Sequence, residues 1–167
     1  LPEATKQLTQ IGGMKLEEAR KFIMITSLIG AIITYPVSLV FSSFILFLIA
    51  KVGAEKVTFR QMLSVTVFTT FILTMGQLIN IIVALLAGTN ANVTSFNSLV
   101  GATGSLGGVL DYIEIFKIWS LILLGLGLYK VGSVSKKLSI IVTLIFFVLI
   151  LVIGAVSGSF SGGIPLQ

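Results

Sequence analysis

The sequence predicts an all-α protein, a polytopic bundle of transmembrane helices. Of its 167 residues, 56% are hydrophobic and only 10% are charged. A soluble domain carries roughly 25% charged residues, so this deficit excludes an ordinary water-soluble globule. Long apolar runs alternate with short polar or glycine-rich segments, and runs of about 20 apolar residues are typical of transmembrane helices. We therefore expect four spans within this chain.

The first predicted span occupies the charge-free run from Phe22 to Ala50. As one straight helix it would reach about 43 Å, against a hydrocarbon core of roughly 30 Å. Pro36, in the middle of the run, removes one backbone hydrogen bond, so we expect a kink and some tilt to accommodate the excess length. A stripe of small residues on one helical face, with Gly30, Thr34 and Ser38 at its centre, predicts close helix packing.

The second predicted span runs from Gln61 to about Ala87, after a short basic loop. Polar side chains form one arc along this helix. Gln77 and Asn80 lie too deep to reach water, and buried amides need hydrogen-bond partners. We expect hydrogen bonds to neighbouring helices, and a polar substrate path is the alternative. The candidate contact residues of this arc are Thr70, Thr74, Gln77 and Asn80.

The segment from Gly88 to Leu110 is uncharged and rich in Gly, Asn, Ser and Thr. It contains no phosphate-binding glycine motif, so we interpret it as a long external loop. The third predicted span follows, from about Tyr112 to Val131. Asp111, Glu114 and Lys117 recur at helical spacing at its start, where acids are favoured and an acid can pair with a following lysine. We expect a structural ladder of charges, and a substrate or ion contact is the alternative.

The fourth predicted span runs from Leu138 to about Ser157 and is almost entirely aliphatic or phenylalanine. It leads into the ladder Gly154-x-x-x-Gly158-x-x-x-Gly162, a pattern that lets helix backbones approach closely. We expect this ladder to contact a partner helix. Gly154→Leu or Gly158→Leu would then release the partner and leave the fold of the chain intact.

The distribution of basic residues predicts the orientation. The hairpins 51–60 and 130–137 are basic, whereas Gly88–Leu110 has no charge, so the positive-inside rule places both hairpins in the cytoplasm and the C-terminus outside. The mixed-charge segment before Phe22 would then lie outside, which a fifth span ahead of Leu1 would explain. The expected domains are an external juxtamembrane segment (1–21), a transmembrane domain (22–158) and an external C-terminal tail (159–167).

The composition excludes several kinds of chemistry. The chain has no Cys and no His, which removes disulfides, thiol chemistry and histidine-based catalysis or metal ligation. No Ser-His-Asp, Cys-His, zinc or two-carboxylate arrangement can be assembled, so we expect no catalytic residue, no cofactor and no metal site. The net charge of +5 comes from residues that flank apolar runs. We therefore expect contact with membrane lipids and no binding of nucleic acid.

The stretch from Asp111 to Lys137 also resembles a known family. Its pattern D-x-x-x-x-F-x-I-W-S-L-x-L-L-G-L-G-L, followed by S-K-K, resembles the signature of bacterial Yip1-domain membrane proteins. The resemblance implies a five-span protein of the bacterial plasma membrane. Some bacterial members resemble partners of macrolide-exporter-like ABC pumps, so it also implies the subunits of an ABC exporter as partners. The acidic D-L-Y-G-P segment of eukaryotic members, which work in vesicle traffic with small GTPases, does not occur in this sequence.

Three classes of function remain compatible with the sequence. The first is a non-enzymatic accessory or assembly subunit of a membrane complex, for which the resemblance implies an ABC-type exporter involved in toxin or antimicrobial-peptide resistance. The second is a self-contained small transporter or lipid-moving protein, although no ionisable residue lies deep in spans one, two and four to couple ions. The third is a membrane-trafficking or membrane-organising factor. We favour the first, because the polar and small-residue faces exceed what four helices use internally.

Overall fold

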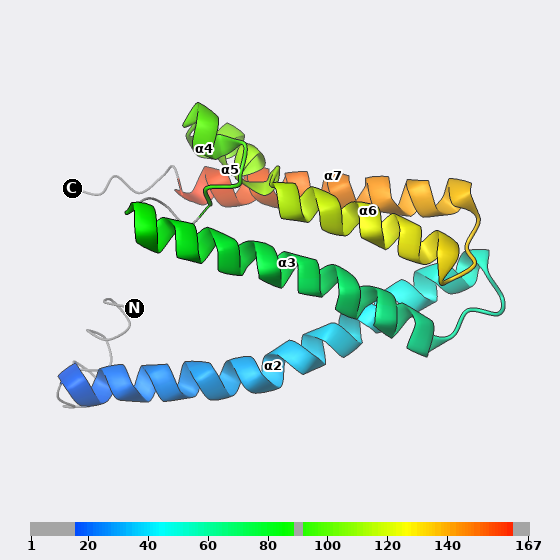
Figure 1. Ribbon diagram of the computed structural model, residues 1–167, viewed down its shortest axis with the longest axis horizontal. Coiled ribbons are helices and arrows are strands. Elements are labelled where there is room, and N and C mark those ends of the chain that lie inside the picture. Colours follow the sequence, from blue (N-terminus) through cyan, green and yellow to red (C-terminus); the bar gives the residue numbers. More distant parts are fainter. Residues whose placement is uncertain (1–15, 89–91, 162–167) are drawn as a thin grey trace. The chain divides into compact units, whose positions relative to one another are not determined.

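Residues 16–88 and 92–161 are described by the computed structural model, and their regular structure is helical (Figure 1). Within this part of the chain, β-type pairing is limited to an isolated bridge between Ser95 and Glu114. The predicted all-α class is therefore confirmed. The helices are α2 (Leu16–Gly53), α3 (Phe59–Ala87), α4 (Asn97–Val100), α5 (Gly104–Tyr112), α6 (Ile115–Lys130) and α7 (Lys136–Ser161).

Three of the described helices, α2, α3 and α7, are long and apolar enough to cross a membrane. They contain the predicted first, second and fourth spans, and the chain is a multi-pass membrane protein. Helix α6 has 16 residues and measures about 24 Å, which is shorter than a hydrocarbon core of roughly 30 Å. The predicted count of four spans, with a fifth ahead of them, is therefore not confirmed.

The chain divides into two compact units, Leu1–Phe41 and Ser42–Gln167. The described part of the first unit is the N-terminal portion of α2, which carries Glu17 and Glu18 in its first turn. Acids are favoured there by the helix dipole. Most of the following side chains in this unit are exposed, as in a helix surrounded by lipid. The helix continues through Pro36, so the proline does not end it, and the predicted kink stays a prediction.

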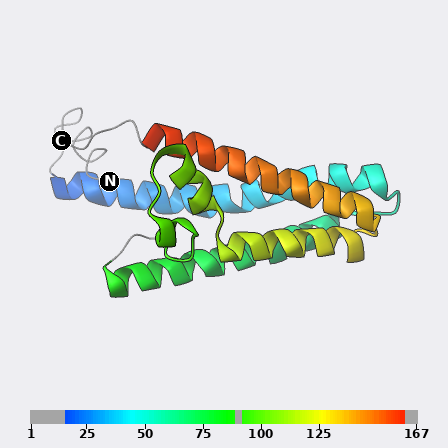
Figure 2. The same cartoon turned by 90° about the horizontal axis from the view of Figure 1, so that it is seen from above.

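The second unit contains the end of α2 and the helices α3 to α7. Helix α5 packs on α7, α3 packs on α6, and α6 packs on α7 (Figure 1, Figure 2). The buried core lies at the end of the unit that contains the hairpins 51–60 and 130–137. The rings of Phe47 and Phe59 meet edge-on there, with centroids 6.3 Å apart. The core residues are Leu46, Ala50, Val57, Met62, Val65, Leu128, Val134 and Val142.

Local capping sets the ends of α3. The Thr58 side chain accepts a hydrogen bond from the Gln61 backbone, and the Gln61 side chain accepts one from the Thr58 backbone. This capping box starts the helix at Phe59, ahead of the predicted start at Gln61. At the other end Gly88 adopts φ 63°, the left-handed conformation that glycine takes without strain.

The interpretation of Gly88–Leu110 as a loop is wrong, because this segment contains α4 and most of α5. Gly101 and Gly104 adopt φ 67° and φ 63°, so the chain can end one helix and start the next within a few residues. The predicted start of the third span at Tyr112 is also wrong. Tyr112 ends α5, and α6 begins at Ile115 after a break.

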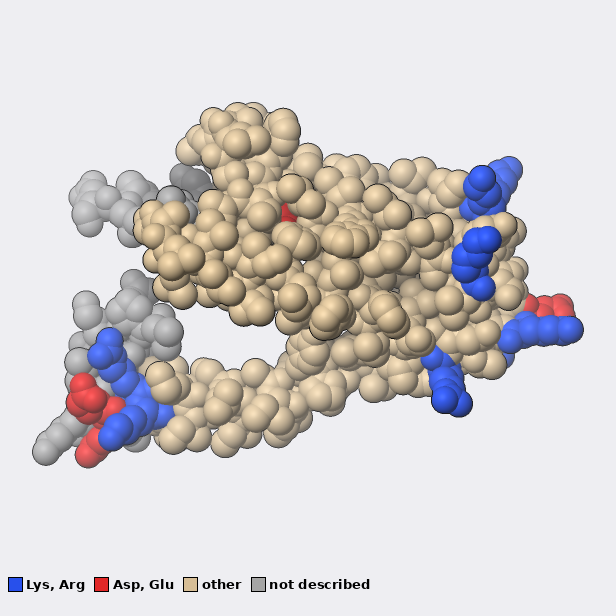
Figure 3. Space-filling model, viewed as in Figure 1, with Lys and Arg blue, Asp and Glu red and all other residues tan. Residues whose placement is uncertain are grey.

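The basic side chains of the hairpins 51–60 and 130–137 gather at one end of the second unit (Figure 3), whereas Lys117 lies at the start of α6. Lys51 lies in the last turn of α2 and Lys130 in the last turn of α6, so the two basic hairpins lie at the same end as the core. The Nζ atom of Lys51 is 5.2 Å from the Phe47 ring centroid, and that of Lys130 is 4.8 Å from the Tyr129 ring centroid. Lysines paired with aromatic rings are typical of a membrane–water interface.

Candidate functional site

The candidate site lies at the opposite end of the second unit, around the break between α5 and α6. Glu114 has an extended backbone, with φ −131° and ψ 142°, and its carboxylate accepts hydrogen bonds from the backbone amides of Phe116 and Lys117. The acid therefore caps the N-terminus of α6, where the helix dipole also favours negative charge. Across the break, the Phe96 amide donates to the Ile113 carbonyl over 2.9 Å.

A buried polar network ties this break to α3. The Oγ1 atom of Thr94 lies 2.7 Å from Glu114 Oε1 and 3.0 Å from Asn80 Oδ1. The Thr94 amide also donates to Asn80 Oδ1 over 3.0 Å. Since the hydroxyl has one proton, it serves Asn80 and Glu114 alternately, while the amide keeps Asn80 satisfied. Asn80 is 6% exposed and Glu114 is 7% exposed, so these bonds are shielded from solvent.

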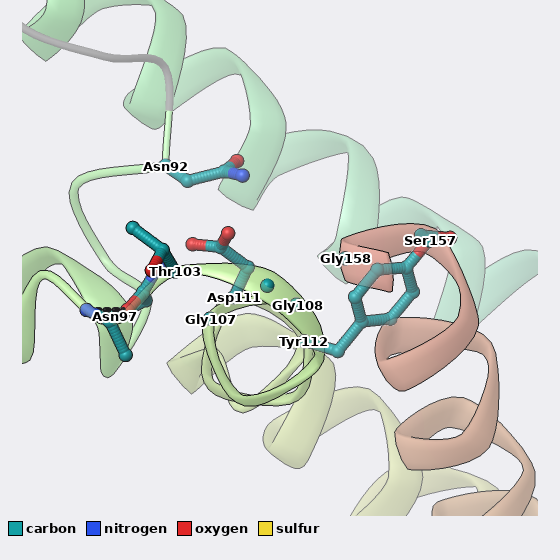
Figure 4. A pocket seen from close by; sticks show the side chains of 11 residues that line it. Asn92, Asn97, Thr103, Gly107, Gly108, Asp111, Tyr112, Ser157 and Gly158 are labelled. Atoms are coloured by element: carbon teal, nitrogen blue, oxygen red, sulfur yellow. Dashed lines mark hydrogen bonds between the residues drawn. The ribbon is translucent and has the colours of Figure 1, made fainter. Parts of the chain in front are cut away.

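A polar cavity of about 360 Å³ opens beside this network. The Asp111 carboxylate points into it and faces the Asn92 side chain, while the Tyr112 ring lies beside Ser157 and Gly158 (Figure 4). Ser95 Oγ donates to Asp111 Oδ1 over 3.2 Å. The residues that line the cavity are Asn92, Asn97, Ala102, Thr103, Gly104, Gly107, Gly108, Asp111, Tyr112, Ser157 and Gly158.

The cavity offers one carboxylate together with amides and hydroxyls. These groups can bind a small polar or cationic group, but they supply no acid–base pair with a nucleophile. Within residues 16–88 and 92–161, no group of three acidic, His or Cys side chains could hold a metal ion. The chemistry available here is recognition and positioning.

The predicted charge ladder of Asp111, Glu114 and Lys117 on one helix is wrong. The break at Ile113 leaves Asp111 on α5, Glu114 at the N-cap and Lys117 on α6. The Lys117 Nζ atom lies 4.1 Å from the Tyr112 ring centroid, a cation–π contact. The Glu114 carboxylate caps α6 through hydrogen bonds from the backbone amides of Phe116 and Lys117.

The glycine ladder of α7 is occupied by α5 of the same chain. A Cβ atom on Gly154 would lie 2.7 Å from the Gly108 carbonyl oxygen, and one on Gly158 would lie 2.8 Å from the Gly108 nitrogen and meet the Gly104 carbonyl oxygen. Such distances allow no side chain at either position. The expectation that Gly154→Leu or Gly158→Leu would leave the fold intact is therefore wrong. Gly162 lies outside the described residues.

The polar arc of α3 is divided between two environments. Asn80 is buried, and its partner is Thr94 in the segment after α3, so the interhelical bond expected for it is made to a loop. Gln77 is exposed. The Thr74 hydroxyl donates to the Thr70 carbonyl over 3.0 Å, within its own helix. The arc therefore does not form one continuous polar path on the inside of the second unit.

The candidate residues of the first span lie in or near the exposed part of the first unit. Gly30, Thr34, Pro36 and Ser38 are all exposed, and a Cβ atom on Gly30 would meet no atom within 4 Å. The Ser38 hydroxyl donates to the Tyr35 carbonyl over 2.8 Å. Their role in helix packing stays a prediction.

Sequence reasoning did not identify Thr94 and Ser95 as members of the site. Both lie in the segment interpreted as a loop, yet Thr94 joins Asn80 to Glu114, and Ser95 is buried against Asp111. The sequence feature that could have indicated them is the run of Asn, Ser and Thr between the amide of Asn80 and the acids Asp111 and Glu114. Short hydroxyl side chains near such groups often supply their hydrogen bonds.

Comparison with known proteins gives one family. The family model described as the Yip1 domain matches residues 5–157. The chain is 35% identical over 158 residues to "Membrane protein YknW" of Bacillus subtilis (strain 168), an alignment that covers 93% of this chain and 62% of that relative. The chain thus spans less than two thirds of the length of this relative. No solved structure matches it significantly.

Proposed function

The chain belongs to the Yip1 domain family of membrane proteins, and we propose that it acts as a non-enzymatic accessory subunit of a larger membrane complex. The observation that carries this proposal is the exposed amide of Gln77 on α3. Gln77 lies about 15 Å from the Ala87 end of the helix and about 27 Å from the Phe59 end, which is deep within a membrane span. No hydrogen bond of its side chain is found among the described residues.

The surroundings of Gln77 favour a protein partner. Its neighbours Leu78 and Ile81 are exposed apolar side chains, and lipid tails cannot satisfy an amide among them. An amide in hydrocarbon without a partner costs several kcal/mol, so this face requires an acceptor or donor from outside the second unit. Gln77 does not line the polar cavity at the helix break, which gives the substrate-path alternative less support.

We propose the subunits of an ABC-type exporter, involved in resistance to toxins or antimicrobial peptides, as the partner to test first. The resemblance of Asp111–Lys137 to bacterial Yip1-domain proteins supports this choice. Because helices in lipid gain little from burying leucine against leucine, amides and small residues are where specific association arises. The exposed Gln77 would provide one such contact.

Replacing Gln77 with leucine should weaken this association about threefold, and at most about thirtyfold, because interhelical hydrogen bonds contribute about 0.6 to 2 kcal/mol in membranes. The measurement is quantitative mass spectrometry of proteins co-purified with the chain from its native membrane. Asn80→Leu is the matched control: its amide is buried within the chain, so it should lower the chain's own stability. Unchanged co-purification by Gln77→Leu, or a lone chain that moves solute in pure liposomes, would argue against the accessory role.

For the topology, we propose that α6 is a short third crossing and that both basic hairpins face the cytoplasm. The gathering of the Lys and Arg side chains of both hairpins at one end of the second unit, with only Lys117 of this unit at the other, supports this orientation through the positive-inside rule (Figure 3). The end of α7 then faces the outside, in the plasma membrane of a bacterium.

Single cysteines can test this orientation cleanly, since the chain has none of its own. Lys56→Cys and Lys136→Cys should react with a membrane-impermeant thiol reagent only after the cells are opened. Leu99→Cys should react in intact cells, because Leu99 is 82% exposed and lies at the other end of the unit. Labelling of the hairpin positions in intact cells would reverse the proposed orientation, and the cysteine-free parent sets the background.

A further inference from the structure

A second hollow, unrelated to the polar cavity, lies between α6 and α7. It is a groove of about 440 Å³, with Ile122, Leu126 and Tyr129 of α6 on one wall and Ile140 and Leu144 of α7 on the other. Its residues recur at intervals of three and four along each helix, so each wall is one continuous helical face. These wall side chains are substantially exposed, which means that the groove opens toward the surroundings of the helices.

The floor of the groove is narrow and presents no unused hydrogen-bond donor. Gly125 forms part of it, and a Cβ atom there would lie 2.6 Å from Thr143 Oγ1. The Thr143 hydroxyl donates to the Ser139 carbonyl over 2.9 Å, and the Ser139 hydroxyl donates to the Ser135 carbonyl over 3.1 Å. Because both hydroxyls already donate to backbone carbonyls, the floor suits a hydrocarbon chain.

The groove has a cation at one end only. Lys136, in the first turn of α7, is its one charged lining residue, and Lys130 lies over the ring of Tyr129 nearby. From Lys136 to Leu144 the groove extends about 12 Å along α7, close to the roughly 15 Å depth of one leaflet of hydrocarbon. A lysine at this level can extend its ammonium group to the headgroups while its stem covers the apolar wall.

We infer that this groove binds one anionic phospholipid, with an acyl chain between α6 and α7 and the phosphate beside Lys136. Basic recesses between transmembrane helices recognise anionic headgroups through this combination of an apolar slot and a terminal cation. A second copy of the chain fits less well, because a two-fold interface through the groove would bring two Lys136 side chains together. The inference depends neither on the accessory role nor on the side of the membrane that the hairpin faces.

A fluorescent reporter at the groove tests this directly. The chain has one Trp, so Trp119→Phe with Tyr129→Trp places the only indole in the groove wall. The full chain is reconstituted in liposomes that contain phosphatidylglycerol or phosphatidylcholine with brominated acyl chains, which quench a nearby indole. We expect the association constant to favour the brominated phosphatidylglycerol about fivefold, the contribution of one lysine near an anionic headgroup.

Two controls make the result specific. Lys136→Gln should reduce the preference to about one, whereas Lys137→Gln, the same change at a residue that does not line the groove, should retain most of it. When Phe68→Trp on α3 replaces Tyr129→Trp as the only indole, the preference for brominated phosphatidylglycerol should be absent. Equal quenching by both lipids, an equal loss in the two lysine variants, or no quenching by either lipid, as when a second copy covers the groove, would each overturn the inference.

Discussion

Gly158→Leu should separate α5 from α7 and lower the free energy of unfolding by about 3 kcal/mol, the upper end of the usual cost of overpacking. The atoms that a new side chain would meet belong to the backbone of α5. A Cβ atom at Gly158 would lie 2.8 Å from the Gly108 nitrogen and 2.9 Å from its Cα. A flexible side chain can rotate away from such a contact, but a helix backbone must move as a whole. Unfolding in mixed micelles, followed by circular dichroism, measures the loss.

The matched control for this prediction is Val156→Leu on the same helix. Val156 is half exposed, so the larger side chain should extend into lipid and leave stability unchanged. Gly108→Leu, on the opposite side of the contact, should reproduce the effect of Gly158→Leu. If Gly158→Leu folds with the stability of the parent chain, α5 does not lie in close contact with α7 at Gly158.

The long helices could be predicted because their sequences leave little choice. A charge-free run such as Phe22–Ala50 must satisfy its backbone polar groups internally in lipid, and a helix does so. The end of α3 at Gly88 also follows from the residue type, since glycine readily adopts the left-handed conformation found there. These features depend on neighbouring residues in the sequence alone.

Helix α5 could not be predicted in this way. Its sequence contains Gly104, Gly107 and Gly108, and glycine disfavours an isolated helix by about 1 kcal/mol per residue. The same absence of side chains lets α5 lie directly against Gly154 and Gly158 of α7, and packing then outweighs propensity. The spacing of the glycine ladder predicts a contact surface on α7. Its partner α5 could not be predicted, because the composition of Gly88–Leu110 indicates a loop.

The different burial of Gln77 and Asn80 could not be predicted from the sequence either. They are separated by about 60° on the helical wheel, so one polar arc predicts the same surroundings for both. Asn80 is buried because Thr94 folds back onto it, whereas Gln77 is exposed. That difference depends on where a segment after α3 returns, which helical periodicity does not contain.

The second large effect is expected at Glu114. Its carboxylate accepts hydrogen bonds from Thr94 and from the amides of Phe116 and Lys117. Glu114→Ala removes the cap of α6, worth up to about 2 kcal/mol, together with the hydrogen bond from Thr94 to a charged acceptor, worth about 1.5 to 3 kcal/mol. We expect the free energy of unfolding to fall by about 3 kcal/mol, measured by the same micellar titration. Glu55→Ala, at an exposed acid, should leave it unchanged.

A double-mutant cycle then tests whether Glu114 acts through the network or only as a cap. Glu114→Gln keeps one carbonyl oxygen and should cost less than Glu114→Ala. Since Glu114 and Asn80 share the hydroxyl of Thr94, Glu114→Gln combined with Asn80→Leu should deviate from additivity by at least about 0.5 kcal/mol. Additive costs would mean that the cap of α6 and the anchor on α3 are independent. A coupled pair would mean that the helix break is held to α3 through Thr94, which keeps Asp111 in place at the polar cavity.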